Sequence, residues 1–350
     1  MIFGSFLLPR SRGRTNFIHP MITRIVFLFL GLSLAWLPLQ GDDEPRPYVR
    51  LEVTKDGARS LQTAWRRMEP ADDSENPVVW LISVCHVGEK AYFTRTQRKL
   101  DAAELVLFEG IGFDGNVTAK KAESGVSSLQ TTLAQTLGLV FQLDAIDYDR
   151  DHFQNSDLGV AELQAELTGS PTPATPADQA SDPKLRAFLK ILEGDSLGLS
   201  LVQGILKLFQ GNPQFRAMAR LVIIETISAS EGDVSKLAGA ASPGMRRLFK
   251  TLIDQRNAVV VRDLRKILRS KEPPSSIAIF YGAGHMLDME SRLREKLNYR
   301  PVGDTWVTAF SVDPGKAGLS SFETTLIRRL VRAQLAKLQQ SGSGSKTKPK

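Results

Sequence analysis

Val78-Val-Trp-Leu-Ile-Ser-Val84 is a continuous apolar run that begins directly after Pro77. A run of this length, rich in β-branched residues and without polar alternation, is typical of a strand buried on both faces of a parallel sheet. The run Ser276-Ile-Ala-Ile-Phe-Tyr281 has the same character and follows Pro273-Pro274. We therefore expect two buried strands, one near each end of the folded region.

The segments that come after the first run predict a βαβ unit. Residues 90–103 are predicted to form a helix, and Glu104-Leu-Val-Leu-Phe108 is a second short apolar run. A helix between two buried strands is the usual connection in parallel sheets. We expect the first block of the chain, residues 45–168, to be built in this way.

The second block begins with predicted helices. Apolar residues recur at helical spacing in residues 183–193, 196–210, 213–228 and 245–268, and the strand at 276–281 is followed by a predicted helix, 286–297, and a strand, 305–312. The fold class expected is therefore α/β. Its central, mainly parallel sheet is flanked by helices, and a helical insertion lies at about 184–270 in the middle of the chain.

The N-terminus resembles an export signal. Arg24 precedes an apolar run at residues 25–39, a layout typical of a signal peptide and short for a bilayer span. Residues 1–41 are thus predicted to be a signal peptide or an N-terminal anchor, with Met21 as the true start and residues 1–20 a misassigned extension. The protein is expected to be periplasmic or secreted, or held at the membrane through residues 25–39.

Residues 42–320 are expected to form one domain, interrupted by a Pro-rich loop at residues 169–183. Residues 321–350 are expected to form a terminal helix and a basic flexible tail. The helix at 322–338 has apolar residues at helical spacing together with several arginines. We favour docking of this helix on the domain, and a peripheral contact with a membrane surface is the alternative.

The formal net charge of +7 lies at the ends of the chain. Residues 1–41 contain four arginines and no acidic residue, and the last five residues contain three lysines; without these seven, the 45 basic residues fall to 38, equal to the 38 acidic ones. A neutral body does not favour a nucleic-acid partner. The single cysteine, Cys85, excludes a disulfide framework and any multi-cysteine metal cage.

Three polar residues come directly after predicted strands in a chain with only four histidines. His86 and His285 each come after a buried run and before a helix, and Glu109 directly follows the run 104–108. The carboxyl ends of parallel strands meet at one edge of a sheet, where ligands bind. Two imidazoles and a carboxylate would suit a divalent metal ion. Capping and packing are the alternative roles for each of them.

A second polar cluster lies at Asp144-Ala-Ile-Asp-Tyr-Asp-Arg-Asp-His-Phe153. Tyr148, Asp149 and His152 are candidate ligands or acid–base groups, and Asp149 is the best of them. We favour a solvated loop with turn-forming aspartates. Cys85 is a candidate nucleophile beside His86, although a cysteine at the end of a buried strand usually serves packing.

Four short segments resemble the TraB/PrgY/GumN family, which includes the Tiki metalloproteases and is distantly related to erythromycin esterases and the haem-binding ChaN proteins. They are Val79–Gly88, Leu105–Glu109, Asp254-Gln-Arg-Asn257 and Phe280-Tyr-Gly-Ala-Gly-His285. The family pattern is Gly-x-x-His after the first strand, Glu after the second, Arg on a later helix and a second Gly-x-x-His near the end. Here Ser83 stands where the first glycine is expected, which restricts the backbone at that turn.

The resemblance implies that His86, Glu109 and His285 hold a divalent metal ion such as Mn²⁺, Co²⁺ or Zn²⁺. Glu109 and Arg256 are then candidate catalytic residues, and Asp149 is added to them from the second polar cluster. Without the resemblance, the favoured role of Arg256 is a structural ion pair with a nearby carboxylate such as Asp254. The expected function is a metal-dependent hydrolase acting on a peptide or small molecule. A non-catalytic peptide- or haem-binding protein on the same scaffold and a structural membrane-surface protein are the alternatives.

Overall fold

The computed structural model describes residues 46–72, 74–110, 125–159, 162, 211–229 and 251–343. The predicted signal peptide or anchor, the Pro-rich loop at 169–183, the helices at 183–193 and 196–210 and the last seven residues lie outside these ranges.

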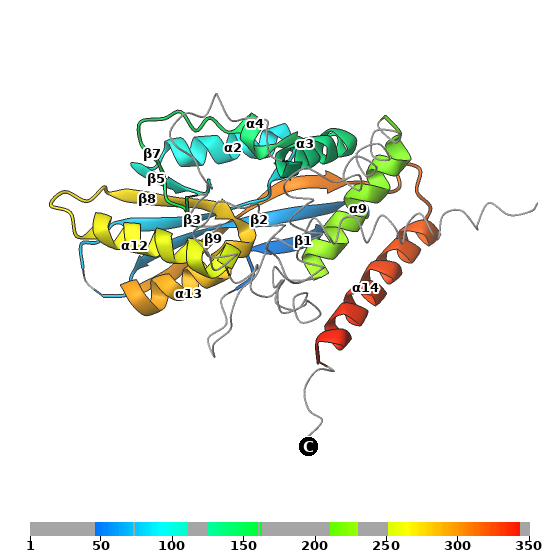
Figure 1. The fold of residues 1–350 in the computed structure, drawn as a ribbon. Coiled ribbons are helices and arrows are strands. Elements are labelled where there is room, and N and C mark those ends of the chain that lie inside the picture. Colours follow the sequence, from blue (N-terminus) through cyan, green and yellow to red (C-terminus); the bar gives the residue numbers. More distant parts are fainter. Residues whose placement is uncertain are drawn as a thin grey trace, which may run out of the picture.

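The centre of the molecule is a seven-stranded mixed sheet (Figure 1). Its strands are β1 (Val49–Val53), β2 (Arg59–Pro70), β3 (Val78–Val84), β5 (Leu105–Phe108), β7 (Phe153–Asn155), β8 (Ser276–Gly282) and β9 (Tyr299–Val312). The order is β1-β2-β3-β8-β5-β7, and β9 pairs with β2. The pairs that β2 makes with β1, β3 and β9 are antiparallel.

The four strands β3, β8, β5 and β7 are parallel. Val84 is in register with Gly282, and Phe108 is in register with both Phe280 and Asn155. The carboxyl ends of all four strands therefore lie at one edge of the sheet. This is the edge at which the sequence predicts a site.

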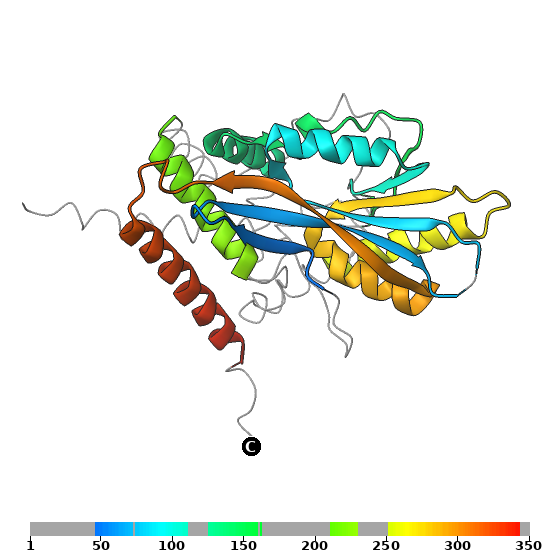
Figure 2. The same cartoon turned by 180° about the vertical axis from the view of Figure 1, so that it is seen from behind.

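Helices cover both faces of the sheet (Figures 1 and 2). One side carries α2 (Lys90–Asp101), α3 (Gly125–Leu137) and α4 (Gln142–Ala145), and the other carries α12 (Arg256–Leu268) and α13 (Met286–Leu297). The helix α9 (Pro213–Ala229) contacts β1, β2 and β9, and α14 (Ser321–Ser343) packs against α9. A π-helical turn at Thr251–Gln255 leads into α12, a 3₁₀ turn at Ala283–His285 leads into α13, and β4 (Val87–Gly88) pairs with β6 (Val140–Phe141).

The prediction of an α/β fold with a helix-flanked sheet is confirmed. The predicted βαβ unit has a different arrangement, because β8 lies between the two strands that α2 connects. The strands β1, β2 and β7 were not predicted, and β9 begins at Tyr299 instead of residue 305. The long strand β2 escapes a search for apolar runs because buried polar residues such as Gln62, Thr63 and Arg66 interrupt it.

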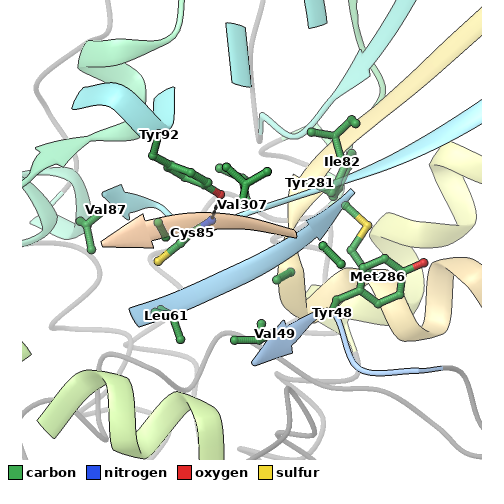
Figure 3. Packing of buried hydrophobic residues seen from close by; sticks show 14 of the residues in the cluster. Tyr48, Val49, Leu61, Ile82, Cys85, Val87, Tyr92, Tyr281, Met286 and Val307 are labelled. Carbon is green, nitrogen blue, oxygen red and sulfur yellow. Dashed lines mark hydrogen bonds between the residues drawn. The ribbon is translucent and has the colours of Figure 1, made fainter. Parts of the chain in front are cut away.

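Cys85 and Tyr92 are core residues that contact each other at the end of β3 (Figure 3). Both side chains are buried, and the Tyr92 hydroxyl accepts a hydrogen bond of 3.1 Å from the Cys85 backbone N–H. The same hydroxyl lies 2.9 Å from Oγ1 of Thr63 on β2. The aromatic ring thus fills apolar space while its polar end satisfies the backbone where β3 ends.

Arg66 is a fully buried cation in the middle of the sheet. Its guanidinium donates to Glu290 Oε2 at 2.6 Å and to Asp304 Oδ1 at 2.7 Å, and it stacks on the Tyr48 ring at 4.2 Å. These contacts join β2 to α13 and β9. A charge is tolerated here because two carboxylates compensate it.

The helix α14 docks through one apolar stripe. Ile327, Val331 and Leu335 are buried, which agrees with the favoured interpretation of a terminal helix packed on the domain. Arg328 adds an ion pair at 3.1 Å to the buried Glu225 of α9. Among the described helices, none has the length and apolar character needed to cross a membrane.

We expect Arg66→Met to lower the free energy of unfolding by about 3–5 kcal/mol, because Glu290 and Asp304 would remain buried without their main counterion. Urea denaturation measures this change. The matched control is Arg67→Met on the same strand, where a half-exposed pair with Glu69 is lost and a change within about 1 kcal/mol is expected. Equal losses in both variants would contradict the role given to Arg66.

Candidate functional site

The four parallel strands each deliver a polar residue to the same edge. His86 follows β3, Glu109 follows β5, Asp157 follows β7 and His285 ends the 3₁₀ turn after β8. Ligand sites of open α/β sheets lie at this edge, where the chain leaves the strands. The arrangement brings together the three residues predicted as metal ligands.

Glu109 occupies the centre of the cluster. Its Oε2 accepts a hydrogen bond of 2.7 Å from the Gly282 backbone N–H, and its Oε1 accepts one of 2.8 Å from Nη2 of Arg256. His285 Nε2 lies 3.7 Å from the same Oε1 atom. The carboxylate thus touches β8, α12 and the turn after β8 at once.

Arg256, the first residue of α12, is clamped by Asp157. The guanidinium donates from Nε to Asp157 Oδ1 at 2.8 Å and from Nη2 to Asp157 Oδ2 at 2.6 Å. The Asp157 side chain is fully buried and also accepts from the Gly110 N–H. Arg256 therefore pairs with Asp157 and Glu109, whereas Asp254, the partner considered from the sequence, lies 3.8 Å from Arg292.

His285 is buried and held by Asn257, the residue after Arg256. The Nδ1 atom of His285 lies 2.8 Å from Asn257 Oδ1. The amide nitrogen of Asn257 donates to the His285 carbonyl at 3.0 Å and to Asp288 Oδ2 at 2.7 Å. On the opposite side of the ring, Nε2 lies 3.4 Å from Nη1 of Arg256.

His86 is held in a similar way by Gln142 of α4. The Nδ1 atom of His86 lies 2.9 Å from Gln142 Oε1, and the amide nitrogen of Gln142 donates to the Tyr148 hydroxyl at 2.7 Å. The Gln142 N–H also donates to the His86 carbonyl at 2.8 Å. Each histidine thus has a buried amide at its Nδ1 side.

Gly282 leaves room between the side chains of Glu109 and His86. A methyl group at this position would come within 3.2 Å of Glu109 Oε2 and 3.2 Å of His86 Nε2. These contacts are tighter than ordinary van der Waals distances. The glycine therefore allows the two side chains to approach the end of β8 from either side.

Burial and neighbouring charges together set the protonation states of Glu109 and His285. The Glu109 pKa lies well below its ordinary value: burial alone would raise it, but the positive charge of Arg256 and the neighbouring imidazoles outweigh burial. Burial is the main cause that lowers the pKa of His285, to about 4; Arg256 acts in the same direction, and the charges of Glu109 and Asp157 oppose the change. At neutral pH the carboxylate is ionised and the His285 imidazole is neutral.

These protonation states fit a divalent metal ion, which binds carboxylates and neutral imidazoles. The donor types of His86, Glu109 and His285 also fit Mn²⁺, Co²⁺ or Zn²⁺. As they stand, however, no three His, Cys, Asp or Glu side chains within the described ranges are grouped so that they could hold a metal ion. Arg256 is the cation that now contacts Glu109 Oε1 and faces His285 Nε2.

The three candidate residues of the second polar cluster lie in different surroundings in the structure. Asp149 is exposed, and its backbone N–H donates to Asp147 Oδ1 at 3.1 Å, which agrees with the turn-forming loop favoured from the sequence. His152 precedes β7 and so lies at the opposite end of that strand from Asp157. Tyr148 accepts a hydrogen bond from Gln142 and so supports the residue that holds His86.

The buried environments of Cys85 and Ser83 indicate a structural role for each residue. Burial raises the pKa of the Cys85 thiol to about 11, so the thiol is protonated at neutral pH and serves packing. Ser83 is fully buried inside β3, in register with Tyr281, and its backbone does not have a positive φ. The sequence predicts that serine in place of glycine restricts the backbone here. Ser83 lies in a regular strand, however, and its backbone conformation is one that serine adopts without strain.

Three supporting residues were missed by sequence reasoning. Asp157 could have been found if Phe153-Gln-Asn155 had been recognised as a strand, because Asp157 then falls at the same edge as Glu109. Asn257 lies in the segment already noted, next to Arg256. Gln142 carries no sequence signal, because only the fold brings α4 beside the end of β3.

The fold and the site define an α/β protein with a buried polar cluster at the carboxyl edge of four parallel strands. Comparisons with protein-family models, with curated proteins and with solved structures gave no match. The function is therefore inferred from the residues of the site.

We expect the stability of the metal-free protein to fall as the pH is lowered from about 6.5 to about 4, because His285 takes up a proton in the unfolded chain before it does so in the folded one. Between pH 7 and 4.5 this difference contributes about 2–3 kcal/mol. Urea denaturation at both pH values measures it. In His285→Gln the loss should be smaller by that amount, and an identical loss in both proteins would contradict the shifted pKa.

Proposed function

We propose that the cluster is the active site of a hydrolase that uses a divalent metal ion held by His86, Glu109 and His285, with peptides as the substrate class. One observation carries the proposal: two imidazoles and one carboxylate from three parallel strands meet at one sheet edge. The sequence resemblance to the TraB/PrgY/GumN family supports the same function.

The charge balance of the cluster favours a bound cation. Within the described residues of the cluster, the fully buried Asp157 side chain and the largely buried Glu109 side chain share one guanidinium, that of Arg256. With a neutral His285, Glu109, Asp157 and Arg256 together carry a net charge of −1. A divalent cation would offset this charge, and a buried charge is costly when it lacks a partner.

The shifted pKa values favour ligand roles over proton transfer. A carboxylate whose pKa lies well below its ordinary value is a weak base at neutral pH, and so is an imidazole with a pKa of about 4. Both shifts instead keep Glu109 and His285 unprotonated, as metal binding requires. A bound metal ion would supply Lewis acidity, polarising a carbonyl group or activating water.

Arg256 has a separate role in this proposal. Because Asp157 holds the guanidinium through two hydrogen bonds, Arg256 stays anchored if Glu109 binds a cation instead. Its Nη1 atom, which faces His285, is then suited to donate to a negative charge that develops on a carbonyl oxygen or to a substrate carboxylate. The Arg256–Asp157 pair thus positions a donor beside the proposed metal ligands.

Calorimetric titration of the full chain with Zn²⁺, Mn²⁺ or Co²⁺ tests the metal site. We expect binding by the wild type, and a loss of affinity of more than about 100-fold in His86→Gln, His285→Gln and Glu109→Gln, because each removes a ligand. The control is His152→Gln, at the opposite end of β7, which should bind like the wild type. Equal affinities in all five proteins would contradict the proposed site.

Turnover of a peptide library separates a hydrolase from a binding protein. Cleavage should require added metal and should disappear in Glu109→Gln, while His152→Gln stays active. Metal binding without metal-dependent cleavage of any peptide would contradict the hydrolase and favour a non-catalytic protein on the same scaffold.

Gly282→Ala tests the space at the end of β8. The added methyl group would press on Glu109 and His86, so we expect metal affinity to fall about 10-fold or more with little change in thermal stability. The matched control is Gly303→Ala on β9, where a methyl group meets no atom within 4 Å. If both variants bind metal as the wild type does, the approach of these side chains to Gly282 is irrelevant to the site.

A further inference from the structure

The hydrogen bonds of Asn257 determine where His285 carries its proton. The Asn257 amide nitrogen faces a carbonyl oxygen and the Asp288 carboxylate, and both of these groups only accept hydrogen bonds. The amide cannot be turned round without losing both bonds. Its oxygen must therefore face His285 Nδ1, which has to be the protonated nitrogen of the ring.

Arg256 leads to the same conclusion from the other side of the ring. A guanidinium can donate hydrogen bonds but cannot accept them. Its Nη1 atom faces His285 Nε2, so an unprotonated Nε2 is the form compatible with this contact. Two independent neighbours thus indicate the Nδ1–H tautomer of His285.

Gln142 makes the corresponding arrangement at His86. Its amide oxygen faces Nδ1 of the ring, and its amide nitrogen donates to the Tyr148 hydroxyl. In this orientation His86 is also protonated at Nδ1. In the neutral ring, Nε2, the nitrogen that lies beside Gly282, is then the one without a proton.

Both amide side chains are buried, although an apolar side chain at either position would avoid the free-energy cost of burying a polar group. Gln142 is 4% exposed and Asn257 is fully buried. A buried amide is unfavourable unless its hydrogen bonds are made, and each of these directs its oxygen at a histidine ring. The two residues come from α4 and α12, which lie on opposite faces of the sheet (Figures 1 and 2).

We infer that Gln142 and Asn257 are a pair of positioning residues that fix His86 and His285 in the Nδ1–H tautomer. In that tautomer the nitrogens without a proton are Nε2 of His285, beside Glu109, and Nε2 of His86, beside Gly282. The tautomers rest on the contacts of the two amides and of Arg256; their consequence for metal affinity rests on the proposed function. A partner that holds the second nitrogen of a metal-binding imidazole commonly contributes a factor of about 10–100 in affinity.

The test uses the full-length, metal-free protein labelled with ¹⁵N-histidine. Two-bond ¹H–¹⁵N correlation spectra distinguish the two tautomers, and His86→Gln and His285→Gln assign the signals. Wild-type His86 and His285 should both show the Nδ1–H pattern. In Gln142→Met the His86 signal should change to the Nε2–H pattern or to a mixture, with His285 unchanged, because the acceptor at Nδ1 is lost.

Gln142→Glu provides the rescue, because a carboxylate still accepts a hydrogen bond from Nδ1. We expect this variant to restore the His86 pattern and the Zn²⁺ affinity that Gln142→Met loses by about 10–100-fold. Gln154→Met, at an exposed position of β7, is the control for the substitution itself and should match the wild type in both measurements. Thermal unfolding verifies that each variant is folded.

The possible outcomes distinguish the positioning role from the proposed function. An Nε2–H pattern of either histidine in the wild type, or a His86 signal that Gln142→Met leaves unchanged, would overturn the positioning role whether or not metal binds. The expected spectra in a protein that binds no metal would support the positioning role and contradict the metal site alone. Asn257→Leu offers the same comparison for His285 if Gln142→Met does not fold.

Discussion

The guanidinium of Arg256 lies between the carboxylates of Asp157, which is fully buried, and Glu109, which is largely buried, and this contact joins parts of the chain that are far apart in sequence. It ties the start of α12 to the ends of β5 and β7, and through Glu109 to the Gly282 N–H at the end of β8. Removing the cation would leave two carboxylates close together and out of water, a situation that folded proteins rarely tolerate. The polar edge of the sheet therefore depends on this pair for its shape.

The contact between Arg256 and Glu109 matters both for the stability of the fold and for the proposed metal site. The bidentate pair with Asp157 uses two of the five guanidinium N–H groups and anchors the side chain without the bond to Glu109. Glu109 is thus paired with an arginine in the present arrangement, and in the proposed function it would bind a metal ion instead. The neutral imidazole of His285 and the ionised Glu109 are consistent with either partner.

Much of the scaffold could be predicted from sequence because its central strands are apolar on both faces. Val78–Val84 and Ser276–Tyr281 are recognisable for this reason, and the position of His86, Glu109 and His285 after strands follows from them. The strand β2 could not be recognised as an apolar run, because it contains the charged residue Arg66. Arg66 is buried because the carboxylates of Glu290 and Asp304 compensate its charge. The roles of Gln142 and Asp157 depend on contacts that only the folded chain creates. Gln142 has no local signal at all, whereas Asp157 follows β7, a strand of three residues that is too short and too polar to stand out in the sequence.

The position of β8 has a consequence for how the protein forms. The strands β3 and β5 are close in sequence, yet neither pairs with the other, because each pairs with β8 from the last third of the chain. Their inner edges stay without a partner until residue 282 has been synthesised, and such long-range pairing is intrinsically slow. The histidines and the glutamate therefore meet only after nearly the whole polypeptide exists. A chain that ends before β8 lacks His285 and leaves β3 and β5 without the strand that joins them, so it cannot form this cluster.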